Sequence, residues 1–130
     1  MKKIMVFGTF DKLHTGHLYL FEQAKKYGDY LIAVIARDVT VKKVKKKLPR
    51  ENENVRLENV KKAKNINEAV LGGAGNKYDV IRKYMPQIIC LGYDQKFFTK
   101  NISKEFPDIK IYRMGAYKPQ IYKSSLLENV

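Results

Sequence analysis

Short apolar runs alternate along this chain with segments whose apolar residues recur at helical spacing. Residues 4–7 and 31–36 are continuous apolar runs, which predicts two buried strands. Between them, apolar side chains recur every three or four positions over residues 20–27, and Gly28 is well placed to end the predicted helix. Strand, helix and strand together span about thirty residues, which indicates two parallel strands joined by a right-handed crossover.

The alternation continues through the rest of the chain. Further strands are predicted at 69–71, 88–91 and 109–112, the last at a sheet edge, and further helices at 55–64, 78–84 and 124–130. No repeat, linker or low-complexity tract interrupts the pattern. We therefore expect residues 1–130 to form a single α/β domain whose sheet of five strands is mostly parallel.

The composition agrees with a folded domain and excludes several other classes of protein. Hydrophobic residues make up 45% of the 130 residues, which is enough for a core despite the charge. No apolar run reaches about 18 residues and no secretory signal follows Met1, so we expect no membrane span and no membrane partner. Cys90 is the single cysteine, which rules out a disulfide within the chain and suits a cytoplasmic protein.

The net charge of +13 indicates an anionic partner, because 26 Lys and Arg stand against 13 Asp and Glu. By itself the charge fits nucleic acid, an anionic membrane or a polyphosphate equally well. Residues 37–50 hold seven basic residues and one acid, a net +6, and residues 109–127 hold four basic residues and no acid. The two segments could converge on one anionic ligand, although a lysine run is also typical of a solvated loop.

The segment after the first predicted strand contains both histidines of the protein and reads GTFDKLHTGH over residues 8–17. Ligands of open parallel sheets bind beyond the carboxyl ends of the strands. Gly8 and Gly16 allow a tight turn and a close approach to a ligand, and the unpaired N–H groups of a helix start favour an anion. His14 and His17, three residues apart, can both donate hydrogen bonds to that anion. The segment therefore predicts a phosphate site.

Two other roles for the histidine pair stay open at this point. Zinc ligation would need further Cys, His or carboxylate ligands, and only Asp11 is nearby, so no metal ligand is predicted here. A structural role would have one histidine packed and the other capping the helix. No nucleophile with an obvious base is present, so a covalent intermediate is not expected.

The pattern GTFDxxHxGH resembles the first signature of the cytidylyltransferase-like family of nucleotidyltransferases, and residues 8–17 match it at every defining position. The resemblance runs over nearly the whole chain and implies a Rossmann-like domain of three layers. It also implies an enzyme that transfers a nucleotidyl group from a nucleoside triphosphate to a phosphorylated acceptor and releases pyrophosphate. Mg²⁺ bound with the triphosphate is the implied cofactor, and a homodimer is the implied oligomer.

The same resemblance implies roles for residues near the first strand. His14 and His17 would contact the triphosphate, with His17 stabilising the transition state. Thr9 and Phe10 would lie beside the nucleotide. Asp11 would order the loop or the acceptor site.

Basic residues acquire roles by resemblance as well. A family lysine that reaches the phosphates corresponds to the run at 42–47, which we expect to be a loop, and Lys46 is the chosen catalytic candidate among its five lysines. Arg56 matches a family arginine that binds the triphosphate or the acceptor, and Arg113 matches one near the nucleotide. Each of these cations has a plain surface charge as its alternative.

The second signature of the family is a Ser/Thr-rich turn at the start of the last helix. Residues 121–126 read IYKSSL here, which departs from the usual form. Ser124 and Ser125 would keep the hydroxyl and amide donors that bind the nucleotide. Ser125 and Glu128 also have the spacing of a capping box, so a structural N-cap is the alternative.

The substrates are inferred from two shorter segments. Residues 36–43 and 91–95 resemble those of archaeal FAD synthases, which are adenylyltransferases acting on FMN, so we expect ATP and FMN, with Tyr93, Asp94 and Gln95 near the nucleobase or ribose. A CTP-dependent cytidylyltransferase acting on glycerol 3-phosphate or a similar polyol phosphate is the alternative. A basic nucleic-acid-binding module without catalysis is a remote one, because the nine tyrosines are dispersed and no such module is recognisable.

Overall fold

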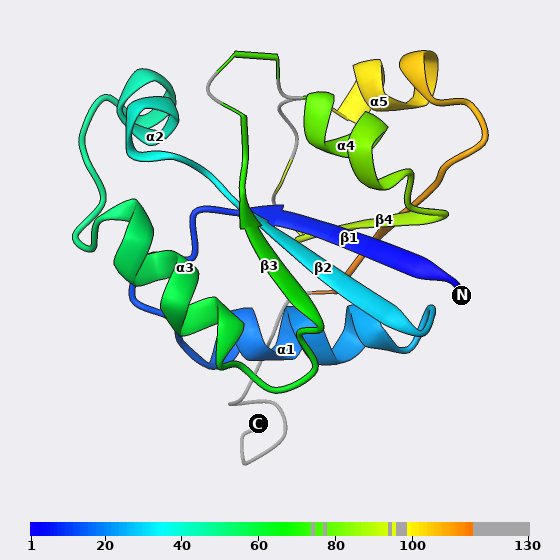
Figure 1. The fold of residues 1–130 in the computed structure, drawn as a ribbon, viewed down its shortest axis with the longest axis horizontal. Coiled ribbons are helices and arrows are strands. Elements are labelled where there is room, and N and C mark those ends of the chain that lie inside the picture. The colour runs from blue at the N-terminus through cyan, green and yellow to red at the C-terminus, as the bar shows by residue number, and fades with distance from the viewer. Residues whose placement is uncertain (74, 77, 94, 96–98, 116–130) are drawn as a thin grey trace, which may run out of the picture.

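Five strands form one sheet in which every pairing is parallel. The computed structural model describes residues 1–73, 75–76, 78–93, 95 and 99–115. The spatial order of the strands is β3-β2-β1-β4-β5 (Figure 1). Their bounds are β1 Lys3–Gly8, β2 Tyr30–Ile35, β3 Glu68–Leu71, β4 Ile88–Leu91 and β5 Lys110–Arg113. The predicted five-stranded sheet is confirmed, with β5 at an edge as expected.

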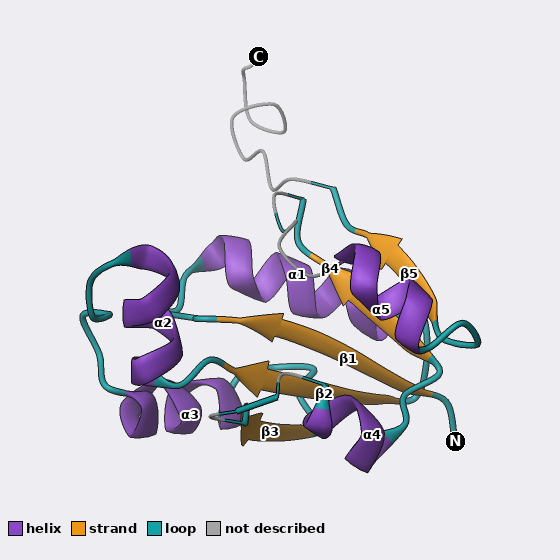
Figure 2. Ribbon diagram, turned by 90° about the horizontal axis from the view of Figure 1, so that it is seen from above, coloured by secondary structure: helices purple, strands orange, loops and turns teal. Residues whose placement is uncertain are grey.

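The helices described cover both faces of the sheet, which gives the predicted three-layer α/β architecture. They are α1 Thr15–Lys25, α2 Asp38–Lys45, α3 Glu53–Lys61, α4 Asp79–Tyr84 and α5 Thr99–Glu105. Helices α1 and α3 lie on one face, and α4 and α5 lie on the other (Figure 1). Helix α2 lies on the side of the molecule toward which β1, β2 and β3 point (Figure 2).

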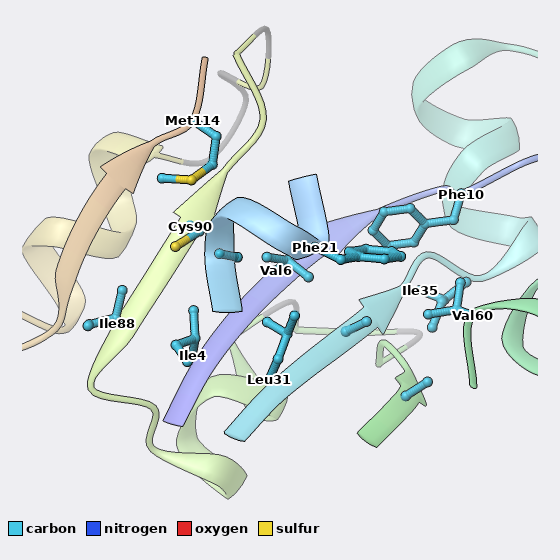
Figure 3. Packing of buried hydrophobic residues seen from close by; sticks show 13 residues of the cluster. Ile4, Val6, Phe10, Phe21, Leu31, Ile35, Val60, Ile88, Cys90 and Met114 are labelled. Atoms are coloured by element: carbon cyan, nitrogen blue, oxygen red, sulfur yellow. The ribbon is translucent and has the colours of Figure 1, made fainter. Parts of the chain in front are cut away.

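The core consists of two layers because the central strands are buried on both faces. Along β1, Ile4 and Val6 pack toward Phe21 of α1, while Met5 packs toward Ile81 of α4 (Figure 3 shows the first of these layers). All five of these side chains are fully buried. Burial on both faces explains why the strands read as continuous apolar runs and not as an alternating pattern.

Two helices differ from the prediction. The lysine run expected as a loop is largely α2, of which only Val41 is buried, so its apolar periodicity is too weak to reveal a helix. The propensity of lysine for helices is nevertheless good. Helix α5 was not predicted, and Ile102 is its buried residue. The helix expected at 124–130 lies outside the described residues.

The loop between α1 and β2 shows a different use of Gly28 from the one predicted. Helix α1 ends at Lys25, before that glycine. A Cβ at Gly28 would lie 2.5 Å from Cδ1 of Ile4 and 2.7 Å from the carbonyl oxygen of Lys2. The glycine is therefore required because the loop passes so close to β1.

The sheet opens between β1 and β4 at its carboxyl end. Pairing of β1 with β2 continues to Gly8↔Ile35, but pairing of β1 with β4 ends at Val6↔Cys90. The chain leaves β1 for α1 on one face, whereas α4 and α5 flank β4 on the other. Such a topological switch point is where open α/β sheets bind their ligands.

Candidate active site

A cavity of about 780 Å³ lies at the carboxyl ends of the strands. Its lining comes from the segments that follow β1, β2, β3 and β4 and from the start of α1. Sequence-predicted site residues among this lining are Thr9, Phe10, Asp11, His14 and His17. The switch point therefore brings together the whole of the first sequence signature.

His14 and His17 cap the helix that they begin. His14 is the N-cap residue of α1, and its Nδ1 accepts a hydrogen bond from the Gly16 N–H at 3.0 Å. In return, Nδ1 of His17 accepts from the His14 N–H at 3.2 Å. The two rings stack with centroids 3.9 Å apart and 25° between their planes. This is a capping box in which imidazoles replace the usual hydroxyl and carboxylate.

The capping bonds determine which tautomer each imidazole adopts in its neutral form. Because each Nδ1 accepts a hydrogen bond, the proton of each neutral imidazole lies on Nε2, which is the donor left for a ligand. The pKa of His17 is lowered to about 4, mainly by burial and also by His14 and Lys45, against the opposing effect of Asp11. At neutral pH His17 thus offers a neutral N–H donor beside the positive end of α1.

Gly16 is required by the position of the His14 ring. A Cβ at residue 16 would lie 2.9 Å from Cε1 and 3.1 Å from Nδ1 of His14. The imidazole could then not approach the helix start closely enough to accept the Gly16 N–H. The glycine between the two histidines thus serves the cap directly.

Phe10 is part of the pocket wall and supports the ring of His17. Its backbone is left-handed, with φ of 54°, and its side chain is 3% exposed. The ring contacts the His17 ring edge-on, with centroids 5.3 Å apart, and packs on Phe21 of the core (Figure 3). An uncommon backbone conformation for a bulky residue at such a site is a form of strain that the surrounding packing maintains.

Asp11 fastens two loops to each other. Its carboxylate accepts hydrogen bonds from the N–H groups of Arg50 and Glu51 at 2.8 and 2.9 Å. Burial acts to raise the pKa of Asp11, but those N–H groups and the nearby cations lower it overall. In the other direction, the Lys12 N–H donates to the Glu51 carboxylate at 2.9 Å. The loop-ordering role considered for Asp11 thus has a direct structural counterpart.

Arg56 is placed under the site and does not line it. The side chain is fully buried at the start of α3. Its guanidinium donates to three carbonyl oxygens and to one carboxylate oxygen at 2.7–3.0 Å; the acceptors belong to Thr9, Ala36, Glu51 and Asp38. The expectation that Arg56 contacts a substrate has no support in this geometry, because its donors bind the chain itself. Sequence could not show this, since the acceptors come from four separate segments.

Two cations line the pocket where Arg56 does not. Arg37 follows β2, donates from Nε to the Gly72 carbonyl at 2.7 Å and pairs with Glu53 at 3.3 Å. From the lysine run, the pocket receives Lys45, whereas Lys46 is the left-handed C-cap residue of α2, with φ of 68°, and is not part of the lining. Helical geometry, which was not foreseen, decides which lysine faces inward.

The opposite side of the pocket is formed by the segment after β4. Tyr93 and Gln95 line it, and the Gln95 side-chain amide bonds to the Phe7 carbonyl of β1 and to the N–H of Gly92, which follows β4. Arg113 donates to the Gly92 carbonyl at 2.9 Å, so it contacts this segment, but it is not among the residues that line the cavity. Asp94, Ser124 and Ser125 lie outside the described residues.

The donor set of the site fits a metal ion carried by phosphate better than one held by the chain. Within the described ranges, no group of three or more His, Cys, Asp or Glu side chains could hold a metal ion. Asp11 is the carboxylate of the pocket lining, and both of its oxygens already accept N–H groups. Mg²⁺ typically keeps several waters and binds through substrate phosphates with one or two carboxylates.

Comparison with known proteins identifies similar chains. The family model described as cytidylyltransferase-like matches residues 5–123. An FAD synthase of Aciduliprofundum boonei is 40% identical over 90% of this chain and 80% of its own length, and one of Thermoplasma acidophilum is 36% identical over 98% and 92%. A crystal structure titled as a lipopolysaccharide core biosynthesis protein from Thermoplasma volcanium superposes with a TM-score of 0.85 at 36% identity, covering 91% of this chain and 99% of that one.

The helices described give no indication of a membrane span. None of them is both long enough and apolar enough to cross a bilayer. Cys90, the free cysteine, is buried in β4, and burial raises the pKa of its thiol to about 12, so it is not a reactive thiolate.

Proposed function

Because the chain belongs to the cytidylyltransferase-like family of nucleotidyltransferases, we propose that it is an FAD synthase that transfers the adenylyl group of ATP to FMN and releases pyrophosphate. The observation that carries the proposal is the pair of capped histidines at the switch-point cavity, in a chain whose relatives named FAD synthase match it over most of their length. The reaction would take place in the cytoplasm.

The chemistry is an in-line displacement at the α-phosphorus. An oxygen of the FMN phosphate forms the new P–O bond, and the bond between the α-phosphorus and the α,β-bridging oxygen breaks as pyrophosphate leaves. The attacking phosphate is already ionised at neutral pH, so the step needs no general base. Catalysis then rests on positioning and on donors aimed at the developing negative charge.

The two Nε2–H groups and the start of α1 supply those donors. We assign His14 and His17 to the triphosphate, with His17 at the transition state, since Phe10 and the cap hold its ring in place. An anionic oxygen can accept the Nε2–H of neutral His17, and this hydrogen bond strengthens as negative charge develops on that oxygen. Lys45 acts on the same oxygens, because it lies close enough to affect the His17 pKa.

The two sides of the cavity suit the two substrates. The β4 side adjoins the switch point and is assigned to the nucleotide, with Thr9 at the end of β1 and with Asp94, Arg113, Ser124 and Ser125 kept as candidates by resemblance. The side formed by β2 and β3 carries Arg37 and is assigned to the phosphorylated acceptor. Arg37 and Lys45 thus replace Arg56 and Lys46 as the proposed substrate-binding cations. Mg²⁺ held by the triphosphate oxygens would neutralise charge on the leaving pyrophosphate.

The decisive experiment measures pyrophosphate release with defined substrate pairs. We expect ATP with FMN to react faster than CTP with glycerol 3-phosphate, and the flavin product to have the mass of FAD. The reverse ranking would reject the FAD synthase assignment and favour a cytidylyltransferase. No release with any pair would leave a binding function.

A histidine variant ties that activity to this site. His17→Ala removes the donor at the transition state, so turnover should fall by about tenfold to a hundredfold or more. Circular dichroism and thermal unfolding check that the variant is folded. Full activity in a folded H17A protein would remove His17 from the mechanism.

A further inference from the structure

At the switch point, the pairing of β1 with β4 ends earlier than the pairing of the neighbouring strands. At the carboxyl end, β1 stays paired with β2 through Gly8, and β4 stays paired with β5 through Leu91. Only the β1–β4 ladder ends sooner, at Val6↔Cys90. The opening that forms this part of the cavity therefore lies between two strands that are otherwise neighbours.

One side-chain amide spans that opening. The Gln95 Oε1 accepts the Gly92 N–H at 2.8 Å, and the Gln95 Nε2 donates to the Phe7 carbonyl at 2.8 Å. The acceptor end thus binds the β4 side and the donor end binds the β1 side. Phe7 directly follows Val6, the last residue of β1 that pairs with β4, and Gly92 directly follows the end of β4. A side-chain amide has the same donor and acceptor as a peptide group, so it can stand between the strands where their ladder would otherwise continue.

The segment that carries Gln95 is itself anchored. The Gln95 N–H donates to the Gly92 carbonyl at 3.2 Å, which closes a turn over residues 92–95. Arg113 donates to the same carbonyl at 2.9 Å. The side chain is therefore held from both ends and from its own backbone, and its two polar atoms are already bonded within the chain.

We propose that Gln95 is a positioning residue that holds β1 and β4 apart at the nucleotide side of the cavity, and that it does not read the base. The inference rests on the proposed function only in requiring that a nucleoside triphosphate bind this cavity. With the amide in place the gap between the strand ends has a fixed width. Without it, the hydrogen bonds of Gln95 to the Phe7 carbonyl and to the Gly92 N–H are lost and the gap is free to close or widen.

Two substitutions at the same position separate the two halves of the bridge. Gln95→Met keeps the length of the side chain and removes both hydrogen bonds. Gln95→Glu keeps an acceptor for the Gly92 N–H but sets a carboxylate against the Phe7 carbonyl. Each variant should weaken ATP binding by about tenfold, as expected for a lost hydrogen bond that leaves a partner unsatisfied, while kcat changes by less than about threefold.

Lowering the pH should restore the nucleotide affinity of the Gln95→Glu variant, which a purely structural role of Gln95 would not predict. A protonated carboxyl has one donor and one acceptor, as an amide does. The affinity of Q95E for ATP should therefore approach that of the wild type as the pH is lowered from 8 to 5, whereas that of Q95M should not.

Gln87 provides a matched control at the other end of the same two strands. Its Oε1 accepts the Lys3 N–H at 2.7 Å, far from the cavity. Gln87→Met should leave the affinity for ATP unchanged. An equal loss of affinity in Q87M and Q95M would mean that β1–β4 stability alone is responsible, and would overturn the proposal.

The measurement is titration of ATP, GTP and CTP binding to the full chain without FMN, followed by steady-state kinetics. Equal weakening for all three nucleotides supports the positioning role. A change confined to ATP, or unaltered binding in folded Q95M, overturns it. If the wild type binds no nucleotide, the proposed function itself fails. If the wild type binds nucleotide and the Q95M variant binds it equally well, only the role proposed for Gln95 fails.

Discussion

The two histidines at the start of α1 are held by their own helix before any ligand arrives. A cap and a phosphate site are usually weighed as alternatives, but here the cap uses Nδ1 and leaves Nε2 for the substrate. His17 fulfils both roles in its neutral form, since a proton on Nδ1 would abolish its capping bond. Protonation of His17 should therefore change the free energy of unfolding of the protein.

We expect His17 to make the free energy of unfolding fall between pH 6.5 and about 4. Its pKa is lowered from 6.5 to about 4, mainly by burial, so the unfolded chain binds more protons in this window. The stabilisation by neutral His17 is complete above pH 6.5 and is lost as the pH falls toward 4. Urea unfolding as a function of pH measures the slope.

The comparison for that slope is His17→Gln, in which the side chain can still accept the His14 N–H but does not titrate. Carboxylates such as Asp11 contribute equally to both proteins and cancel in the difference. Identical slopes in H17Q and the wild type would contradict the lowered pKa of His17.

At the scale of elements, α2 determines which part of the basic run acts on the ligand. A helix directs consecutive residues about 100° apart, so adjacent lysines do not share a target. Lys45 lines the cavity, and Lys46 ends the helix in a left-handed conformation. The remaining positive charge of α2 stays on the outside and is available for steering anionic substrates.

Substitution of Lys45 and of Lys46 tests this difference directly. Lys45→Ala should lower kcat/KM for ATP by about tenfold or more, because it removes a cation from the charge that develops in the transition state. Lys46→Ala, one residue away with the same change in net charge, should lower it by less than about threefold. Kinetics at two salt concentrations separate the local contact from general steering. A larger effect in K46A would reverse the assignment.

At the scale of the whole molecule, Arg56 joins segments that are distant in the sequence. Its hydrogen bonds connect the end of β1, the end of β2, the start of α2 and the loop before α3. Two of the acceptor residues, Thr9 and Ala36, line the cavity. A fully buried cation is favourable only with such complete pairing, since its removal from water is costly.

Arg56→Met should therefore destabilise the fold by about 3–5 kcal/mol, because it removes the cation that pairs with Asp38 and the N–H donors to three carbonyl oxygens. Arg56→Lys should restore little of this, since an ammonium cannot reproduce the planar fork. Arg82→Ala is the control: its ion pairs with Asp79 and Glu105 are half-exposed, and their loss should cost at most about 1 kcal/mol. Denaturant unfolding measures all three, and a small effect of R56M would contradict the role given to Arg56.

Local sequence patterns were sufficient for the strands and for the histidine pair. Parallel strands buried on both faces are continuous apolar runs, and His14 and His17 are placed by one turn of helix. The buried position of Arg56, the inward position of Lys45 and the strand-bridging position of Gln95 were beyond such patterns, although Arg56 and Gln95 were expected at the ligand. Their positions depend on which carbonyl, helix face or strand opening the folded chain brings to them, and those partners come from distant segments.

The position of β1 in the middle of the sheet has a consequence for synthesis. Ile4 pairs with Ile88, so one side of the first strand to be made waits for residues 84 positions later (88 − 4 = 84). Until then β1 is an exposed edge, open to pairing with other chains. Closing so long a loop is slow. We expect nascent chains that end before β4 to be prone to aggregation, and the catalytic cavity to become complete only after that strand has left the ribosome.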